Sequence, residues 1–144
     1  MDELNSIGKA EEQYMNIKQK RIYDEILVTD GKRILLDRLW PRGIKKEVAQ
    51  IDLWPKGLSP SNKLRKWYHE APEQRWDVFQ QRYLEELAEQ SQDLDELWNF
   101  MTREKTVTFL TASKNTMQNH LTVIVNLFKQ RETERCLYCL TINM

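Results

Sequence analysis

The stretch Thr106–Ala112, with the sequence TVTFLTA, limits the fold more than any other part of this 144-residue chain. Its β-branched and aromatic residues predict a buried strand in the interior of a sheet. Other strand-like runs lie near residues 20–28, 33–40 and 136–142, and segments with helical periodicity separate them. This alternation predicts an α/β fold, with a single domain and a small, mainly parallel or mixed sheet flanked by helices.

The connections between these runs carry their own signals. Asp30-Gly31 lies between the first two runs and is typical of a hairpin turn. The alternative is that the first run continues into a loop and the two strands are not neighbours. After the second run, Pro41 lacks a backbone donor and Gly43 permits a positive φ, so the strand is expected to end sharply there.

Four segments have apolar residues at helical spacing. Their predicted starts are Ser59-Pro60, Pro72, a capping box of Asp93 with Glu96, and Asn115 or Thr116. The last helix is predicted to end before a final strand at Cys136–Ile142. Residues 1–17 are expected to be an extension, disordered or loosely helical, ahead of a single domain over residues 18–144.

The composition excludes some locations and partners. No apolar run is long enough to cross a bilayer, and the polar, acidic N-terminus is not a secretory signal. Two cysteines in such a chain are typical of a reducing compartment. We therefore expect a cytoplasmic protein that does not contact a membrane.

The charges balance overall, with 22 basic and 22 acidic residues, but they are segregated. Residues 32–66 hold ten basic and three acidic residues, whereas residues 70–104 hold three basic and ten acidic ones. One interpretation is that two solvated faces differ in charge and pair with each other. The other is that the basic segment attracts an anionic ligand.

Arg38 and Arg42 are the candidate anion-binding residues. In parallel sheets the ligand crevice lies beyond the carboxyl ends of the strands, and both arginines follow a predicted strand. Two guanidinium groups at this position can grip a phosphate or a carboxylate. The alternative is that they pair with Asp37, Asp52 or Glu86 and only pin the loop.

His120 is the candidate catalytic residue, as a general acid or base near the start of a helix. Ser113 and Asn119 are candidates for orienting a ligand beside it. The alternative is a histidine packed on the sheet with its nitrogens satisfied. Cys136 and Cys139 form a C-x-x-C pair, but strand alternation would place them on opposite faces, so we expect buried, inert thiols. No motif for a metal or a cofactor is present, and we expect neither.

Several strings in these segments resemble the YeaO-like family, which carries the domain of unknown function 488. The most specific are LDRLWPRG at Leu36–Gly43, LRKW at Leu64–Trp67 and TFLTAS at Thr108–Ser113. The resemblance covers roughly residues 18–130 and implies a small bacterial-type α/β domain with no established activity. Family members tend to have an acidic residue in a string like Ala-Lys-Asp, where this chain has Ser113-Lys114-Asn115.

Two functional hypotheses remain open. The first is an enzyme, or a degraded enzyme, that binds a small anionic metabolite or nucleotide at the strand-end crevice. The second is a non-catalytic binding module for nucleic acid or a protein partner, using the basic face of residues 32–66. An isoelectric point near 6.7 makes nucleic acid the less favoured partner. Convergence of Arg38, Arg42, Asn119 and His120 on one concave pocket favours the first hypothesis.

Overall fold

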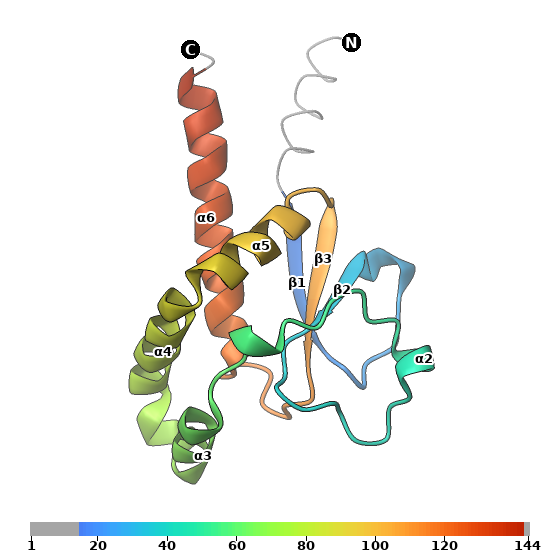
Figure 1. Ribbon diagram of the computed structural model, residues 1–144, viewed down its shortest axis with the longest axis vertical. Helices are drawn as coiled ribbons and strands as arrows, with labels where there is room; N and C mark the ends of the chain where they lie inside the picture. Colours follow the sequence, from blue (N-terminus) through green and yellow to red (C-terminus); the bar gives the residue numbers. More distant parts are fainter. Residues whose placement is uncertain (1–14, 143–144) are drawn as a thin grey trace.

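Three parallel strands form the sheet, in the order β1-β3-β2 (Figure 1). They are β1 (Asn16–Arg21), β2 (Lys32–Leu35) and β3 (Thr106–Thr111). The computed structural model describes residues 15–142, with side chains as far as residue 137. The predicted α/β class and the predicted interior strand are confirmed, because β3 pairs on both sides. The predicted hairpin is wrong and the alternative, in which the first two strands are not neighbours, is confirmed, since β3 separates them.

Asp30 and Gly31 form a turn of another kind than the predicted hairpin. The segment after β1 crosses β3 and ends in a short 3-10 turn, η1 (Val28–Asp30), which leads directly into β2. Gly31 has a φ of 64°, and a Cβ atom at this position would lie 2.1 Å from the backbone oxygen of Thr106. Only glycine allows this close approach to the central strand. The predicted first strand, near residues 20–28, is misplaced, since β1 runs from Asn16 to Arg21 and begins within the predicted extension of residues 1–17.

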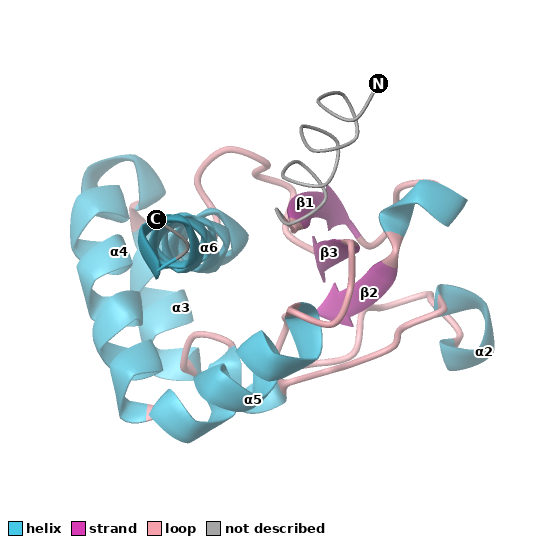
Figure 2. Ribbon diagram, turned by 90° about the horizontal axis from the view of Figure 1, so that it is seen from above, coloured by secondary structure: helices cyan, strands magenta, loops and turns pink. Residues whose placement is uncertain are grey.

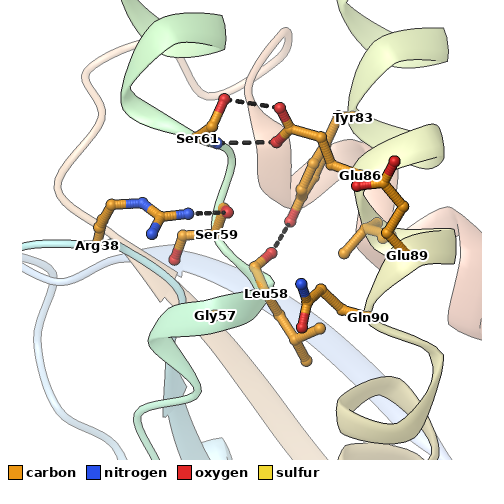
Figure 3. A pocket seen from close by; sticks show the side chains of 10 residues that line it. Arg38, Gly57, Leu58, Ser59, Ser61, Tyr83, Glu86, Glu89 and Gln90 are labelled. Carbon is orange, nitrogen blue, oxygen red and sulfur yellow. Dashed lines mark hydrogen bonds between the residues drawn. The ribbon is translucent and has the colours of Figure 1, made fainter.

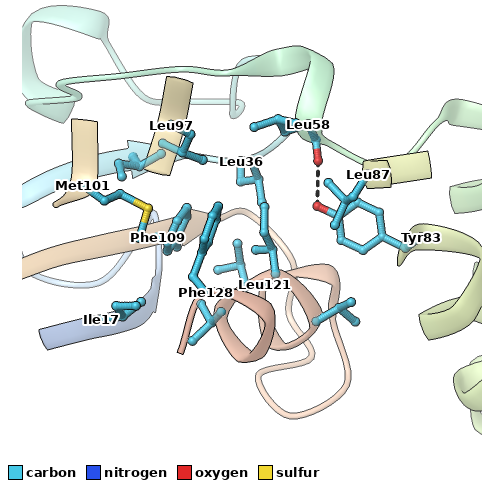
Figure 4. Packing of buried hydrophobic residues seen from close by; sticks show 14 of the residues in the cluster. Ile17, Leu36, Leu58, Tyr83, Leu87, Leu97, Met101, Phe109, Leu121 and Phe128 are labelled. Atoms are coloured by element: carbon cyan, nitrogen blue, oxygen red, sulfur yellow. Dashed lines mark hydrogen bonds between the residues drawn. The ribbon is translucent and has the colours of Figure 1, made fainter. Parts of the chain in front are cut away.

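Four helices lie on the same side of the sheet, as Figure 2 shows. They are α3 (Asn62–Glu70), α4 (Pro72–Glu89), α5 (Ser91–Met101) and α6 (His120–Ile142). Phe109 of β3 and Phe128 of α6 are fully buried and stack at 6.0 Å between ring centroids (Figure 4). Trp98 of α5 also stacks on Phe128, at 5.8 Å between ring centroids. This main core attaches α5 and α6 to the sheet.

The predicted strand at Cys136–Ile142 is wrong, because α6 continues to Ile142. Phe128, Glu132 and Cys136 follow one another at a spacing of four and are all buried, which marks a helical face. The carboxylate of Glu132 accepts a hydrogen bond from the backbone N of Met15 at 3.2 Å. An acidic residue on the buried face interrupts the apolar stripe, so the sequence pattern hid the last turns of the helix.

The predicted helix starts were less accurate than the helices themselves. The start of α4 at Pro72 is confirmed. The Oγ of Ser61, two residues later than predicted, accepts from the N of Leu64 and caps α3. The start of α5 has no side-chain cap, so the predicted capping box at Asp93 is wrong. Asn119 caps α6 in place of Asn115 or Thr116.

The second face of the sheet is covered by loops from residues 22–31 and 37–54, which include the short helix α2 (Lys46–Ala49). The 3-10 turn η2 (Lys56–Leu58) lies on the helical side instead, where it contacts α5 and Leu58 is part of the main core. Trp40 and Trp54 lie edge to face, 5.3 Å apart, beside a small cluster that includes Leu35 and Leu110. Among residues 15–142, no helix is long and apolar enough to cross a membrane. The cytoplasmic location stays a prediction, and residues 1–14 of the predicted extension lie outside the described residues.

Candidate functional site

The carboxyl ends of the three parallel strands meet at one edge of the sheet, and Asp37 is the centre of the contacts there. Its Oδ1 accepts a hydrogen bond from Thr111 Oγ1 at 2.6 Å, and its Oδ2 accepts one from the backbone N of Ala112 at 2.7 Å. These bonds tie the exit of β2 to the exit of β3. The backbone O of Asp37 also accepts from Trp54 Nε1, which attaches the outer loop to the same residue.

His120 is the third partner of Asp37. Its Nε2 lies 3.3 Å from Asp37 Oδ1 and 2.5 Å from the carbonyl oxygen of Leu36. Burial by itself raises the pKa of Asp37, but hydrogen bonds from His120 and Thr111, the charge of His120 and the N–H of Ala112 lower it more. The pKa of Asp37 is therefore below its usual value, and the group is a carboxylate at neutral pH.

The groups around His120 determine which of its ring nitrogens carries a proton and which is left for proton transfer. Both neighbours of Nε2 are acceptors, so Nε2 must be the donating nitrogen. The ring meets Tyr83 edge to face at 6.3 Å, and only 13% of the side chain is exposed. This matches the alternative in which His120 packs on the sheet. Only Nδ1 is left over for proton transfer.

Asn119 and Ser113, the predicted orienting residues, make contacts within the fold. Asn119 is buried, and its Oδ1 accepts from the backbone N atoms of Leu121 and Thr122 at the start of α6. Its Nδ2 donates to the carbonyl of Asn115. The carbonyl of Ser113 accepts from Arg21 Nε at 3.0 Å. These bonds hold the loop after β3 in place. They also engage both side-chain polar atoms of Asn119 within the fold.

Arg38 lies at a separate pocket of about 200 Å³, next to the strand-end contacts. Its Nη2 donates to the carbonyl of Ser59 at 2.9 Å (Figure 3), and its Nε donates to the carbonyl of Pro60 at 3.2 Å. Among residues 15–142, no carboxylate lies within ion-pairing distance of the Arg38 guanidinium and Nη1 makes no hydrogen bond. Arg38 therefore holds the loop through two backbone carbonyls and forms no direct ion pair with the described residues.

The opposite wall of the pocket comes from α4 (Figure 3). The two carboxylate oxygens of Glu86 accept from the backbone N of Ser61 at 2.8 Å and from its Oγ at 2.6 Å. Tyr83 donates to the carbonyl of Leu58 at 2.6 Å, and burial raises its pKa well above the usual value, so it stays a neutral donor. Glu89 is exposed at the rim.

Arg42 does not join Arg38. Its side chain is exposed and does not line the pocket, while its backbone O accepts from the hydroxyl of Tyr23 at 3.1 Å. The carboxylates suggested as its partners are engaged elsewhere: Asp37 by His120, and Asp52 by the backbone N of Arg33. Convergence of Arg38, Arg42, Asn119 and His120 on one pocket would have favoured the enzyme hypothesis, but of these four residues only Arg38 lines the pocket.

Sequence reasoning missed Ser61, Tyr83 and Glu89 as lining residues, and it saw Glu86 only as a partner for an arginine. The spacing Tyr83, Glu86 and Gln90 places these side chains on one face of a helix and was a usable signal. Tyr83 on this face is also part of the buried core. No group of three metal-ligating side chains was found over the described part of the chain.

Comparisons with known proteins identify the family. Residues 16–136 match the family model described as "Inactive DUF488-N3 subclade". The uncharacterised protein YeaO of Escherichia coli is 43% identical over 112 residues, which cover 78% of this chain and 96% of that protein. The uncharacterised protein Rv3073c of Mycobacterium tuberculosis is 40% identical over 115 residues, which cover 80% of this chain and 95% of that protein. No solved structure matches the chain. The chain belongs to the YeaO-like DUF488 family.

Proposed function

We propose that this protein is a non-catalytic binding protein whose pocket, beside Arg38, receives the anionic group of a small ligand. The observation that carries the proposal is the state of Arg38: a half-buried guanidinium, anchored by two carbonyls, with no carboxylate of the described residues within ion-pairing distance. A guanidinium held through Nε and Nη2 presents its other nitrogen to a carboxylate or a phosphate without losing its anchor.

The Ser59 hydroxyl supports the same pocket. Ser59 lines it, is 4% exposed, and its Oγ has no hydrogen-bond partner within the described residues. A buried hydroxyl without a partner costs free energy, and a change of rotamer toward a ligand would recover it. The pocket therefore offers a charged group and a neutral donor on one wall.

The non-catalytic part of the proposal rests on the strand-end residues. Nε2 of His120 is engaged by two acceptors, and Asn119 is used as a helix cap. Within residues 15–142 no side-chain set for holding a metal is present. The matched family is described as an inactive subclade, and we carry that description to this chain as part of the proposal.

Isothermal titration with inorganic phosphate and with butyrate tests the proposal. We expect Arg38→Gln to weaken binding of both anions by about tenfold or more, because a charge-assisted bond is lost. Arg42→Gln is the matched control, since it removes a guanidinium of the same loop outside the pocket. Equal losses in the two variants, or no binding of either anion at millimolar concentration by the folded parent, would refute the proposal.

The basic-face alternative has one observation in its favour. Lys46 lies over the rings of Trp40 and Trp54, at 5.5 and 5.9 Å, and Lys56 lies over Trp54 at 4.0 Å. Because lysines cover these rings, such a face would contact phosphates and not stack on bases. Titration of a single-stranded oligonucleotide at several salt concentrations, with Lys46→Gln combined with Lys56→Gln, tests this function.

A further inference from the structure

The two walls of the Arg38 pocket carry opposite charge, which restricts the ligand beyond its anionic group. Arg38 and Ser59 lie on the loop side, and Glu86, Glu89 and Gln90 lie on the α4 side (Figure 3). The pocket holds one guanidinium and two carboxylates. A plain anion that reached Arg38 would therefore lie across from two groups that repel it.

Glu86 is a fixed part of this wall. The side chain is half-buried, and each carboxylate oxygen accepts one hydrogen bond from Ser61. A carboxylate oxygen has two lone pairs, so Glu86 can accept further donors without releasing Ser61. Its position is set by the helix start of α3 and not by a ligand.

Glu89 is the available carboxylate. It lies one turn further along α4 than Glu86, it is exposed, and over residues 15–142 its carboxylate makes neither an ion pair nor a hydrogen bond. Gln90, the next residue, ends the helix and also lines the pocket. A ligand's ammonium group placed between Glu86 and Glu89 would be attracted by both carboxylates. Arg38 would then be available to bind the carboxylate of the same ligand.

We infer that the ligand of this pocket is a small zwitterion, with a carboxylate at Arg38 and an ammonium group at Glu86 and Glu89. The inference rests on the proposed function and names its ligand class. A pocket of about 200 Å³ equals roughly seven water molecules, so the ligand is of the size of a short amino acid.

The test uses pairs of probes that differ only in the ammonium group: 4-aminobutyrate against butyrate, and 5-aminovalerate against valerate. By isothermal titration, we expect the parent to bind the amino acid of at least one pair about two- to fivefold more tightly, as for a solvent-accessible ion pair. Glu89→Gln should remove this preference and at the same time strengthen binding of the plain acid. Arg38→Gln should weaken both members of the pair.

Glu85→Gln is the control, because Glu85 is an exposed carboxylate on the same helix that does not line the pocket. One contrary result is that the parent binds both members of each pair equally well, while Arg38→Gln weakens the binding of all four probes. This result would overturn the inference that the ligand is a zwitterion and would leave the proposed function standing. A preference that Glu89→Gln and Glu85→Gln reduce alike would also overturn it. Absence of binding by any probe would overturn the proposed function itself.

Discussion

Removing the carboxylate of Asp37 should destabilise the protein severely, because three donors from two other elements point at it. Thr111 Oγ1 and the N of Ala112 make short bonds, at 2.6 and 2.7 Å, and His120 Nε2 lies at 3.3 Å. Hydrogen bonds to a charged group contribute about 1.5–3 kcal/mol each. Counting only the two short bonds, we expect Asp37→Ala to lower the free energy of unfolding by about 3–5 kcal/mol.

Asp37→Asn should cost less. The amide oxygen can still accept from the N of Ala112, but the amide NH2 then faces the Thr111 hydroxyl and His120, which also donate. We expect a loss of about 1.5–3 kcal/mol for this variant. Asp77→Ala, on the exposed side of α4, is the control and should stay within about 0.5 kcal/mol of the parent.

The assay is urea unfolding at several pH values. The dependence of the free energy of unfolding on urea concentration is compared between variants, because an equal slope excludes a change in the unfolded state. Because the pKa of Asp37 is lowered on folding, its contribution is complete above the ordinary value of 3.8 and is lost as the pH falls through the folded value. The difference in free energy of unfolding between the parent and Asp37→Ala should therefore become smaller below pH 3.8. A gap under about 1 kcal/mol at pH 7, or one that does not narrow in acid, would refute the reasoning.

Three further predictions concern stability and can be measured by the same urea assay. Gly31→Ala should cost more than about 2 kcal/mol, since a Cβ would lie 2.1 Å from the Thr106 oxygen at a positive φ; a smaller loss would mean that the turn relaxes. Tyr83→Phe keeps the buried ring but loses its hydrogen bond to a loop carbonyl, and should cost about 1–2 kcal/mol; no loss would show that the bond is replaced by water. Arg38→Gln should cost about 1–3 kcal/mol through its two carbonyl bonds, whereas the exposed Arg42→Gln should cost under about 0.5 kcal/mol; equal costs would contradict the different roles given to them.

Sequence patterns were reliable where one residue's neighbours along the chain decide its environment. The helical periodicity of the segment that starts at Pro72 predicted α4, because its apolar side chains form one face that meets the same core: Trp76, Phe79, Tyr83 and Leu87. The pattern failed where a distant partner compensates a polar residue. Glu132 on the buried face of α6 is such a case, since the N of Met15, 117 residues away, satisfies it.

The residues of the candidate site show the same contrast between what local sequence indicates and what tertiary packing decides. The sequence pointed to Arg38, because a charged residue after a strand and before a Pro-Gly break lies at a ligand-binding edge. It also pointed to Arg42, in the same loop, and to His120, near the start of the helix that follows the third strand, and nothing local showed which of the three lines a pocket. The exposure of Arg42 and the engagement of His120 by Leu36 and Asp37 depend on how the loops pack.

The sequence by itself determined that the chain is α/β, that Thr106–Thr111 is a buried interior strand, and that Arg38 lies beyond a strand end, because hydrophobic periodicity and turn chemistry are local properties. Only the tertiary structure decided that β3 lies between β1 and β2, and that Glu86 and Glu89 face the Arg38 loop from α4. Strand order and the composition of a pocket arise from contacts between residues far apart in the chain. Such contacts follow from the packing of complete elements and leave no periodic signal in either segment.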